Sequence, residues 1–137
     1  MDLVINTDGA SRGNPGQAAY GMVIRKRDGE ILHQEGKRIG INTNNFAEYT
    51  AILESIKYVA EHFGHKGPHQ IEVLCDSLLA VQQLSGNYKI KNPILRELFF
   101  KIKELEIEVG QVRYRHIPRE ENFVADRLGN IALDTQG

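Results

Sequence analysis

The sequence LVINTDG at residues 3–9 decides the fold, because an apolar run over residues 3–7 leads directly into the acid Asp8 and a glycine. This run is predicted to be a strand. Residues 20–27 and 30–39 are also strand-like, and the Asp28-Gly29 dipeptide between them is typical of a tight hairpin turn. The first forty residues are therefore predicted to form three antiparallel strands.

After this meander the hydrophobic period changes from that of a strand to that of a helix. From Asn45 to Phe63 apolar residues recur at helical spacing, and Asn44 or Asn45 is placed to cap this helix. The remaining predicted elements are a strand at 71–75, a short helix at 77–84, a helix from Pro93 to about Leu105, a strand at 111–117 and a helix at 121–133. Helices join the later strands, so these strands should be parallel. We expect an α/β fold with a mixed five-stranded sheet flanked by helices, in one domain over residues 1–137.

The totals are those of an ordinary globular chain, with 41% hydrophobic and 26% charged residues and a single cysteine, Cys75. No run is long enough to span a bilayer, and the start MDLVINTDG turns polar too early for a signal peptide. We expect a cytoplasmic protein without an internal disulfide. The net charge of −1 argues against binding nucleic acid by bulk attraction alone, but not against an enzyme that pairs a local basic rim with an acidic metal site.

Four acids occupy element ends: Asp8 after the first strand, Glu48 in the first turns of the long helix, Asp76 after the fourth strand and Asp126 near the start of the last helix. Sites in open α/β sheets form beyond the carboxyl ends of strands. If the first and fourth strands are neighbours, Asp8 and Asp76 emerge side by side and the helix acids can complete a cluster. Taken singly, each acid is more readily explained as a turn, cap or helix-dipole residue.

A cluster of carboxylates requires a cation, because like charges raise each other's pKa. Oxygen-rich sites suit Mg²⁺ or Mn²⁺. Two such ions about 4 Å apart stabilise the attacking and leaving oxygens of an in-line phosphoryl displacement. The shared ligand should be the rigid residue on the central strand, Asp8.

Four motifs resemble those of type 1 ribonuclease H: NTDGAS at 6–11 followed by GNPG at 13–16, TNNFAE at 43–48, Asp76-Ser77, and NFVAD at 122–126. They occur in order over essentially the whole chain, and the extended first motif together with TNNxxE is specific. The resemblance implies a ribonuclease H-like fold and hydrolysis of the RNA strand of an RNA–DNA hybrid, with 3′-hydroxyl and 5′-phosphate ends. It implies that Asp8, Glu48, Asp76 and Asp126 are the catalytic carboxylates and bind two Mg²⁺ ions, for which Mn²⁺ can substitute.

By the same resemblance, the residue at Asp8 bridges both ions, Glu48 and Asp76 help hold the ion on the leaving-group side, and Asp126 helps hold the ion that carries the attacking water. A protein distinguishes RNA from DNA by the 2′-hydroxyl. The candidate substrate contacts are Gly9, Ala10, Ser11, Arg12, Asn14, Thr43, Asn44 and Asn45. For Asn14 and Asn44, turn and cap roles are equally good explanations.

The chain departs from the best-known bacterial members after the short middle helix. Residues 85–92 lead directly to the next helix where those members carry a basic, Trp-containing protrusion, and the chain has no Trp. It resembles the compact archaeal and Bacillus-type members, some of which act on other RNA-containing duplexes, so double-stranded RNA is a second candidate partner. We expect a monomer with weaker, salt-sensitive hybrid binding.

The family's assisting histidine has its candidate in His116, ten residues before Asp126. A histidine held at the end of the fifth strand is an equally good interpretation, and Arg119, Glu120 or Glu121 could then assist. The other histidines, His33, His62, His65 and His69, show no ligand spacing and are predicted to be surface groups. Cys75 is predicted to be a core residue.

Three other functions compete with an active nuclease. A catalytically silent hybrid-binding or double-stranded-RNA-binding module of the same fold has no need for a repulsive acidic cluster. An aspartyl-phosphate phosphatase would use Asp8 as nucleophile and normally needs an acid two residues later, where Ala10 stands. A DNA-directed nuclease or integrase relative is disfavoured by TNNxxE.

Overall fold

The structure is a computed structural model that describes residues 1–135. Its strands are β1 (Asp2–Gly13), β2 (Gly16–Lys26), β3 (Ile31–Asn42), β4 (His69–Cys75) and β5 (Gly110–His116). Its α-helices are α1 (Asn44–Phe63), α2 (Leu78–Leu84), α3 (Pro93–Val109) and α4 (Phe123–Thr135), with short 3-10 helices at Gly64–Lys66 and Arg119–Glu121. The sheet has the order β3-β2-β1-β4-β5, antiparallel between β3, β2 and β1 and parallel between β1, β4 and β5. The predicted mixed five-stranded sheet is confirmed.

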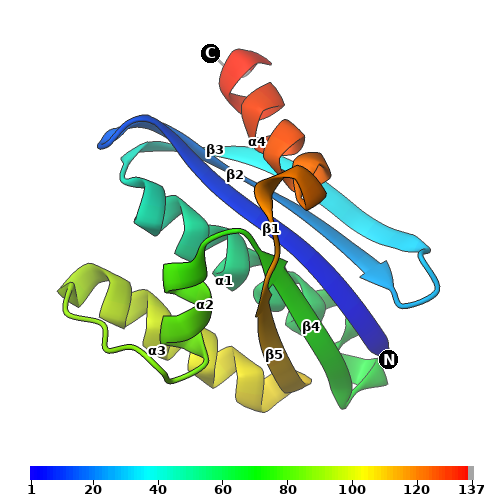
Figure 1. Ribbon diagram of the computed structural model, residues 1–137. Coiled ribbons are helices and arrows are strands. Elements are labelled where there is room, and N and C mark those ends of the chain that lie inside the picture. The colour runs from blue at the N-terminus through cyan, green and yellow to red at the C-terminus, as the bar shows by residue number, and fades with distance from the viewer. Residues whose placement is uncertain (136–137) are drawn as a thin grey trace.

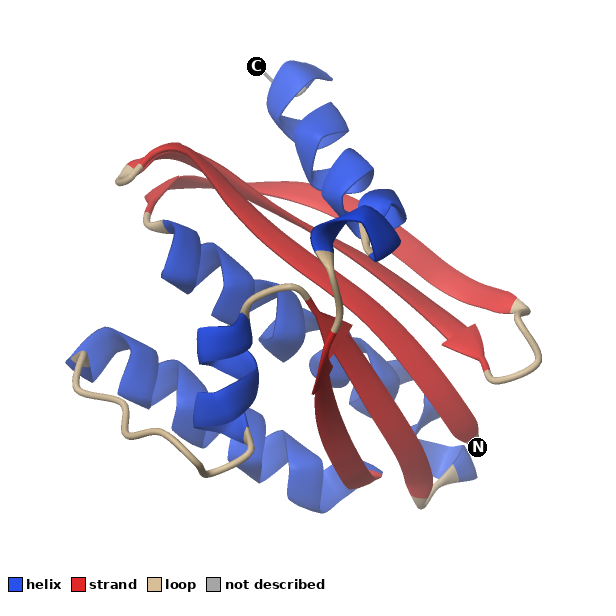
Figure 2. Ribbon diagram, viewed as in Figure 1, coloured by secondary structure: helices blue, strands red, loops and turns tan. Residues whose placement is uncertain are grey.

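The sheet separates two unequal layers of helices (Figures 1 and 2). The helices α1, α2 and α3 share the main core with one face, where Leu3, Ile5 and Ile52 are fully buried. On the other face α4 crosses β1, β2 and β3 alone and packs Ala132 and Leu133 against Ala19. Because α4 covers only this part of its face, β4, β5 and the beginning of β1 remain without a helix on that side.

The first hairpin is longer than the apolar pattern predicted. β1 pairs with β2 as far as Gly13, so Asp8 lies in the middle of a strand, and the prediction that it ends the strand is wrong. The pattern fails because backbone pairing to β2 continues after the apolar run has stopped. Side chains beyond Asp8 are progressively exposed, so the second half of β1 projects as a ribbon beyond the core.

Glycines let α4 lie directly on the sheet. A Cβ at Gly21 would lie 1.9 Å from the carbonyl oxygen of Ala125, and a Cβ at Gly36 would lie 2.1 Å from that of Leu128. Real atoms do not approach so closely, so any side chain at these positions would push the helix away. Gly21 and Gly36 thus fix the distance of α4 from β2 and β3.

Several predicted boundaries shift by a few residues. Thr43 caps α1, since its hydroxyl accepts from the Phe46 amide at 3.1 Å, so the assignment of the cap to Asn44 or Asn45 is wrong. The third helix runs one turn past Leu105, because Gly110 with φ of 125° ends it. The last helix begins at Phe123, since Arg119–Glu121 forms a separate 3-10 turn.

One predicted surface group is buried. His69 is 1% exposed, and its Nε2 lies 2.8 Å from the carbonyl oxygen of Phe63. His33 is partly covered, because its ring stacks on Tyr58 at 3.8 Å between centroids. Both predictions relied on the absence of ligand spacing, which says nothing about burial. Within residues 1–135 no helix is both long and apolar enough to cross a membrane.

Candidate active site

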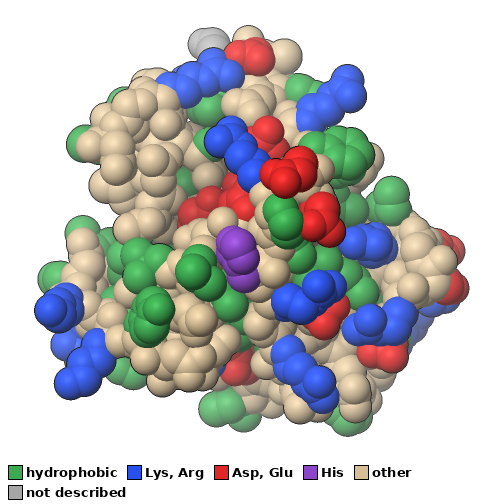
Figure 3. Space-filling view, in the orientation of Figure 1, with side chains coloured by type: hydrophobic (Ala, Val, Ile, Leu, Met, Phe, Trp, Pro, Cys, Tyr) green, Lys and Arg blue, Asp and Glu red, His purple; other side chains and the backbone are tan. Residues whose placement is uncertain are grey.

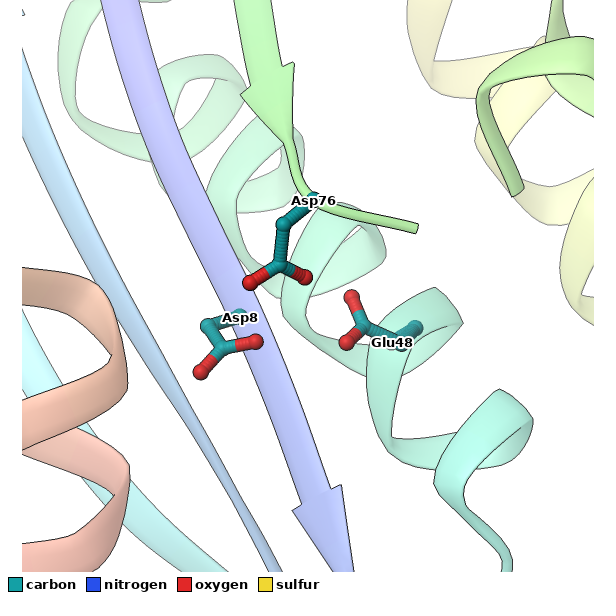
Figure 4. Close-up of side chains that lie close together, drawn as sticks. All are labelled: Asp8, Glu48 and Asp76. Atoms are coloured by element: carbon teal, nitrogen blue, oxygen red, sulfur yellow. The ribbon is translucent and has the colours of Figure 1, made fainter. Parts of the chain in front are cut away.

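Two of the candidate acids emerge side by side at the centre of the sheet. Thr7 lies opposite Cys75 in the parallel pair of β1 and β4, which places Asp8 and Asp76 next to each other. Figure 4 shows their carboxyl groups and that of Glu48 directed toward one another. One carboxylate oxygen from each of the three lies within 4.8 Å of the others. The structure thus meets the condition set by the sequence, that the first and fourth strands are neighbours.

Glu48 reaches the cluster because α1 touches β1 through backbone atoms. A Cβ at Gly9 would lie 2.2 Å from the carbonyl carbon of Ala47 and 2.3 Å from the amide nitrogen of Glu48. The missing side chain therefore allows the first turn of α1 to rest on the strand beside Asp8. The Gly9 amide also donates to the Glu48 carboxylate.

Burial and mutual repulsion disfavour full ionisation of these acids. Asp8 is 6% exposed and Glu48 7% exposed. Loss of water, followed by repulsion from Glu48 and Asp76, raises the pKa of Asp8 to about 10. Burial and the charge of Asp76 raise the pKa of Glu48 to about 8, although the Gly9 amide and the Cys75 thiol oppose this shift. A bound cation would offset the repulsion between these acids and stabilise their buried charges, so this donor set fits a hard divalent metal ion.

Asp126 approaches the cluster from the opposite layer. It lies in the first turn of α4 and within hydrogen-bonding range of Asp8. Arg119 extends toward it, with 3.7 Å between Nη2 and the Asp126 Oδ1. The structure thus brings all four candidate acids together, three in a tight group and the fourth beside Asp8.

A buried amide pair, which the sequence analysis missed, positions the start of α4. Asn6 Nδ2 donates to Asn122 Oδ1 at 3.1 Å, and Asn122 Nδ2 donates to the Thr7 carbonyl oxygen at 2.8 Å. Asn122 is 1% exposed. Both residues stand within the motifs that carried the resemblance, two and four positions before an acid, but nothing in that spacing indicates that they bond to each other.

The predicted substrate residues gather where the β1–β2 hairpin meets the start of α1. The Ser11 amide donates to Asn44 Oδ1 at 2.8 Å, and the Asn44 amide donates to Asn14 Oδ1 at 3.0 Å. The turn and cap roles of Asn14 and Asn44 are thus present. Within residues 1–135, the side-chain nitrogens of both asparagines make no hydrogen bond. Arg12 is paired with Asp134 at 2.7 Å.

The other residues predicted to contact substrate or to assist catalysis lie around the acidic cluster. Thr43 is occupied as a cap, whereas Asn45 is exposed at the first turn of α1. Gly9 and Ala10 follow Asp8 along β1. His116 is the last residue of β5, where the strand-end interpretation placed it; its side chain is exposed and forms no hydrogen bond with any residue of 1–135.

Cys75 is buried as predicted, and its thiol also touches the cluster, with 3.5 Å between Sγ and the Glu48 Oε2. Burial, followed by the charge of Glu48, raises the pKa of this thiol well above its usual value. A protonated thiol is a weak nucleophile. Cys75 therefore lines the site with an uncharged thiol.

No extra helix separates α2 from α3, and residues 85–92 form a short connection. Tyr88 and Lys89 in this connection line a shallow hollow of about 360 Å³ together with Arg96, Phe99 and Phe100. The chain therefore has the compact form that the sequence indicated.

Comparison with known proteins agrees with this geometry. A family model described as reverse transcriptase-like matches residues 6–132. The crystal structure of LC11-RNase H1 in complex with an RNA/DNA hybrid superimposes with a TM-score of 0.94 at 41% sequence identity, covering 98% of both chains. The chain belongs to the type 1 ribonuclease H family.

Other relatives of this ribonuclease H are archaeal and bacterial. The RNase H1 of Halobacterium salinarum has a TM-score of 0.90 at 39% identity and 98% coverage of both chains. Ribonuclease HI of the same organism is 41% identical over 127 residues, which are 93% of this chain and 62% of that protein. The bifunctional protein Rv2228c of Mycobacterium tuberculosis is 39% identical over 135 residues, which are 98% of this chain but 36% of that protein. The chain thus spans between about a third and two thirds of the length of these curated relatives.

Proposed function

We propose that this ribonuclease H is a metal-dependent endonuclease that hydrolyses the RNA strand of RNA–DNA hybrids and leaves 3′-hydroxyl and 5′-phosphate ends. The observation that carries the proposal is the group of Asp8, Glu48 and Asp76, whose oxygens lie within 4.8 Å of one another in a buried position. A protein that only binds nucleic acid gains nothing from such repulsion. The complex of LC11-RNase H1 with an RNA/DNA hybrid supports the substrate class.

Asp8, Glu48, Asp76 and Asp126 would hold two Mg²⁺ ions, with Mn²⁺ as a substitute, and Asp8 would bridge them. The ions supply charge stabilisation to the attacking and leaving oxygens of an in-line displacement. Asp8 suits the bridging role because it lies in the middle of the central strand, where it pairs with Gly21 of β2 and directly follows the last pair with β4, Thr7 and Cys75. Gly9 and the thiol of Cys75 orient the Glu48 carboxylate, and Asn122 holds the first turn of α4 that carries Asp126.

Recognition of the hybrid would fall to the ridge formed by Asn14, Asn44 and Asn45. The side-chain nitrogens of these residues can donate to the substrate while Asn14 and Asn44 use their oxygens within the protein. The Ser11 amide is already bonded to Asn44 and the Gly9 amide to Glu48; Gly9 and Ala10 follow Asp8 directly in β1, and their remaining backbone groups would read a 2′-hydroxyl. The candidates for assisting water activation or product release are His116, Arg119, Glu120 and Glu121.

The test is cleavage of an end-labelled RNA–DNA hybrid with Mg²⁺, Mn²⁺ or EDTA, beside single-stranded RNA, duplex RNA and duplex DNA. We expect metal-dependent cuts in the RNA strand of the hybrid, with products that a 5′-phosphate-dependent exonuclease degrades. Cleavage of duplex RNA would add that substrate. Absence of cleavage with either metal, in a protein shown to be folded, would reject the proposal in favour of a catalytically silent binding module.

A matched pair of variants separates the site from general charge effects. Asp8→Asn removes one carboxylate charge from the cluster, and Asp28→Asn removes one from the exposed β2–β3 turn. We expect Asp8→Asn to lose at least about a thousandfold in rate, in line with the loss of a principal electrostatic contribution, while Asp28→Asn stays at the parent rate. Substantial activity in Asp8→Asn would contradict the bridging role.

A further inference from the structure

The part of the sheet that α4 leaves uncovered lies on the same face as the catalytic acids. Side chains alternate along a strand, so Asp2, Val4 and Asn6 point to the same side as Asp8. On β4 and β5 this side carries Glu72, Arg113 and Arg115, because Arg113 pairs with Glu72 and Arg115 with Leu74. We call this surface, below α4 in Figure 1, the open face.

Arginines flank the open face on both sides. Arg25 and Arg27 stand on the β2 side, and Arg113 and Arg115 stand on β5. Figure 3 shows Lys and Arg side chains gathered over this region with acids between them. The four arginines outnumber the acids that line the face, which are Asp2, Glu72 and Glu121. In a chain of net charge −1 this is a local basic rim.

The existing ion pairs on this face are weak enough to be replaced by phosphate. Arg27 Nε lies 3.7 Å from Asp2 Oδ1, and Arg115 Nη2 lies 3.5 Å from Glu72 Oε1. Exposed pairs at such distances contribute little to stability. Arg113 has no ion pair with any residue of the described chain and lines a hollow of about 190 Å³ with Arg27 and Gln111.

A second hollow, of about 270 Å³, lies beside Arg25 at the start of α4. Phe123 lines it with 63% of its surface exposed, and Ile31 and Val124 complete an apolar wall. An exposed aromatic ring next to an arginine suits stacking of a nucleobase, with its phosphate held by the cation. Both hollows have the volume of a single base or nucleotide and neither can seat a duplex.

We propose that the open face binds single-stranded nucleic acid that extends from the substrate, with Phe123 stacking on a base and Arg113 and Arg115 contacting phosphates. Arg115 and Arg113 lie about 7 and 13 Å before Asp76 in strand register, at about 3.3 Å per residue, so both arginines follow the site along β5 and can contact phosphates of a strand that leaves it. An unpaired base is needed because the bases of a duplex are already stacked on each other. The binding surface goes beyond the proposed hydrolysis and requires no metal.

The test compares a short blunt RNA–DNA hybrid with the same hybrid carrying an oligothymidine tail at either end, by fluorescence anisotropy. The cleavage-deficient Asp8→Asn protein is used so that the substrates stay intact. We expect a tail of one polarity to tighten binding about tenfold. Equal binding of blunt and tailed hybrids in both polarities would overturn the proposal, as would an equal gain when the tail is made double-stranded.

Variants then place the tail on the protein. Phe123→Ala and Phe123→Leu should each lose about fivefold or more of the affinity for the tailed hybrid, because one stacked base is lost. Arg113→Gln with Arg115→Gln should reduce the salt slope for the tailed hybrid by about 1.4, or about 0.7 per phosphate contact. The control, Lys57→Gln with Lys101→Gln, removes the same charge from the α1–α3 side and should change neither quantity.

If the Phe123 and arginine variants bind the tail as well as the parent does, while thermal melts show them folded, the location is wrong. Cleavage of the blunt hybrid by the wild-type protein is measured separately. Loss of that activity would reject the proposed hydrolysis but leave tail binding intact, so the two failures are distinguishable.

Discussion

Replacing Asp8 by asparagine should stabilise the metal-free protein, and the gain should grow with pH. The folded chain holds a proton on the acidic cluster, because burial and repulsion raise the pKa of Asp8 to about 10 from 3.8. Below about pH 4 Asp8 is protonated in both the folded and the unfolded state, so its protonation costs the folded state nothing. As the pH rises above this value, the unfolded chain releases the proton while the folded chain keeps it, so stability falls until the folded pKa is passed.

The size of the change in unfolding free energy follows from the single proton that the folded chain keeps on Asp8. Each proton retained only by the folded state costs about 1.4 kcal/mol of stability per pH unit. From about pH 5.5 to 7.5 the parent should therefore lose about 2.7 kcal/mol more than Asp8→Asn, which has no proton to hold at this position. Glu48 remains beside Asp76 in the variant, so it affects both proteins and largely cancels in the comparison.

Urea unfolding followed by circular dichroism, in EDTA at several pH values, measures this difference. Saturating Mg²⁺ should flatten the pH dependence of the parent and leave the variant nearly unchanged, since the cation replaces the proton. Asp28→Asn should behave as the parent, because its carboxylate lies in an exposed turn. Parallel pH curves for parent and Asp8→Asn in EDTA would refute the reasoning, because they would show that the folded chain does not hold a proton on Asp8 above its ordinary pKa.

Three further results are expected from other parts of the molecule. Gly21→Ala should destabilise the protein in thermal melts by about 1–3 kcal/mol or more and reduce cleavage, because the new Cβ meets the Ala125 carbonyl oxygen. The control Gly64→Ala, whose Cβ meets nothing, should change neither stability nor cleavage. Asn122→Ala should cost about 2–3 kcal/mol in urea unfolding, because it leaves buried groups unpaired, and unchanged stability would show that the amide pair is not needed. Cys75 should not react with a thiol reagent in the native protein but should react fully in denaturant, since the thiol is buried and its pKa is raised; rapid native labelling would contradict this.

The fold could be predicted because local signals agree along the chain. The Asp28-Gly29 turn and the helical period after Asn45 each act over a few residues, and the structure follows both. The length of β1 could not be predicted in this way. Its second half is paired to β2 but hardly buried, so the hydrophobic pattern does not record it.

The sequence predicted which acids form the site but not how all four are arranged in space. The proximity of Asp8 and Asp76 follows from adjacent parallel strands. The approach of Asp126 depends on Gly21, Gly36 and Asn122, which act on α4 from distant parts of the chain. His69 shows the same limit, since its buried ring contacts the carbonyl oxygen of Phe63, a contact that no spacing rule reveals.

Because Gly9 contacts the Ala47–Glu48 peptide, backbone contact sets how closely the elements that carry Asp8 and Glu48 approach each other. Most core distances depend on how large side chains interlock, and they drift when those side chains are exchanged. Here backbone touches backbone, so the approach of α1 to β1 at this point does not depend on interlocking side chains. Even one methyl group at position 9 would push the strand and the helix apart. The closest approach of the elements that carry Asp8 and Glu48 is therefore set by the absence of a single side chain.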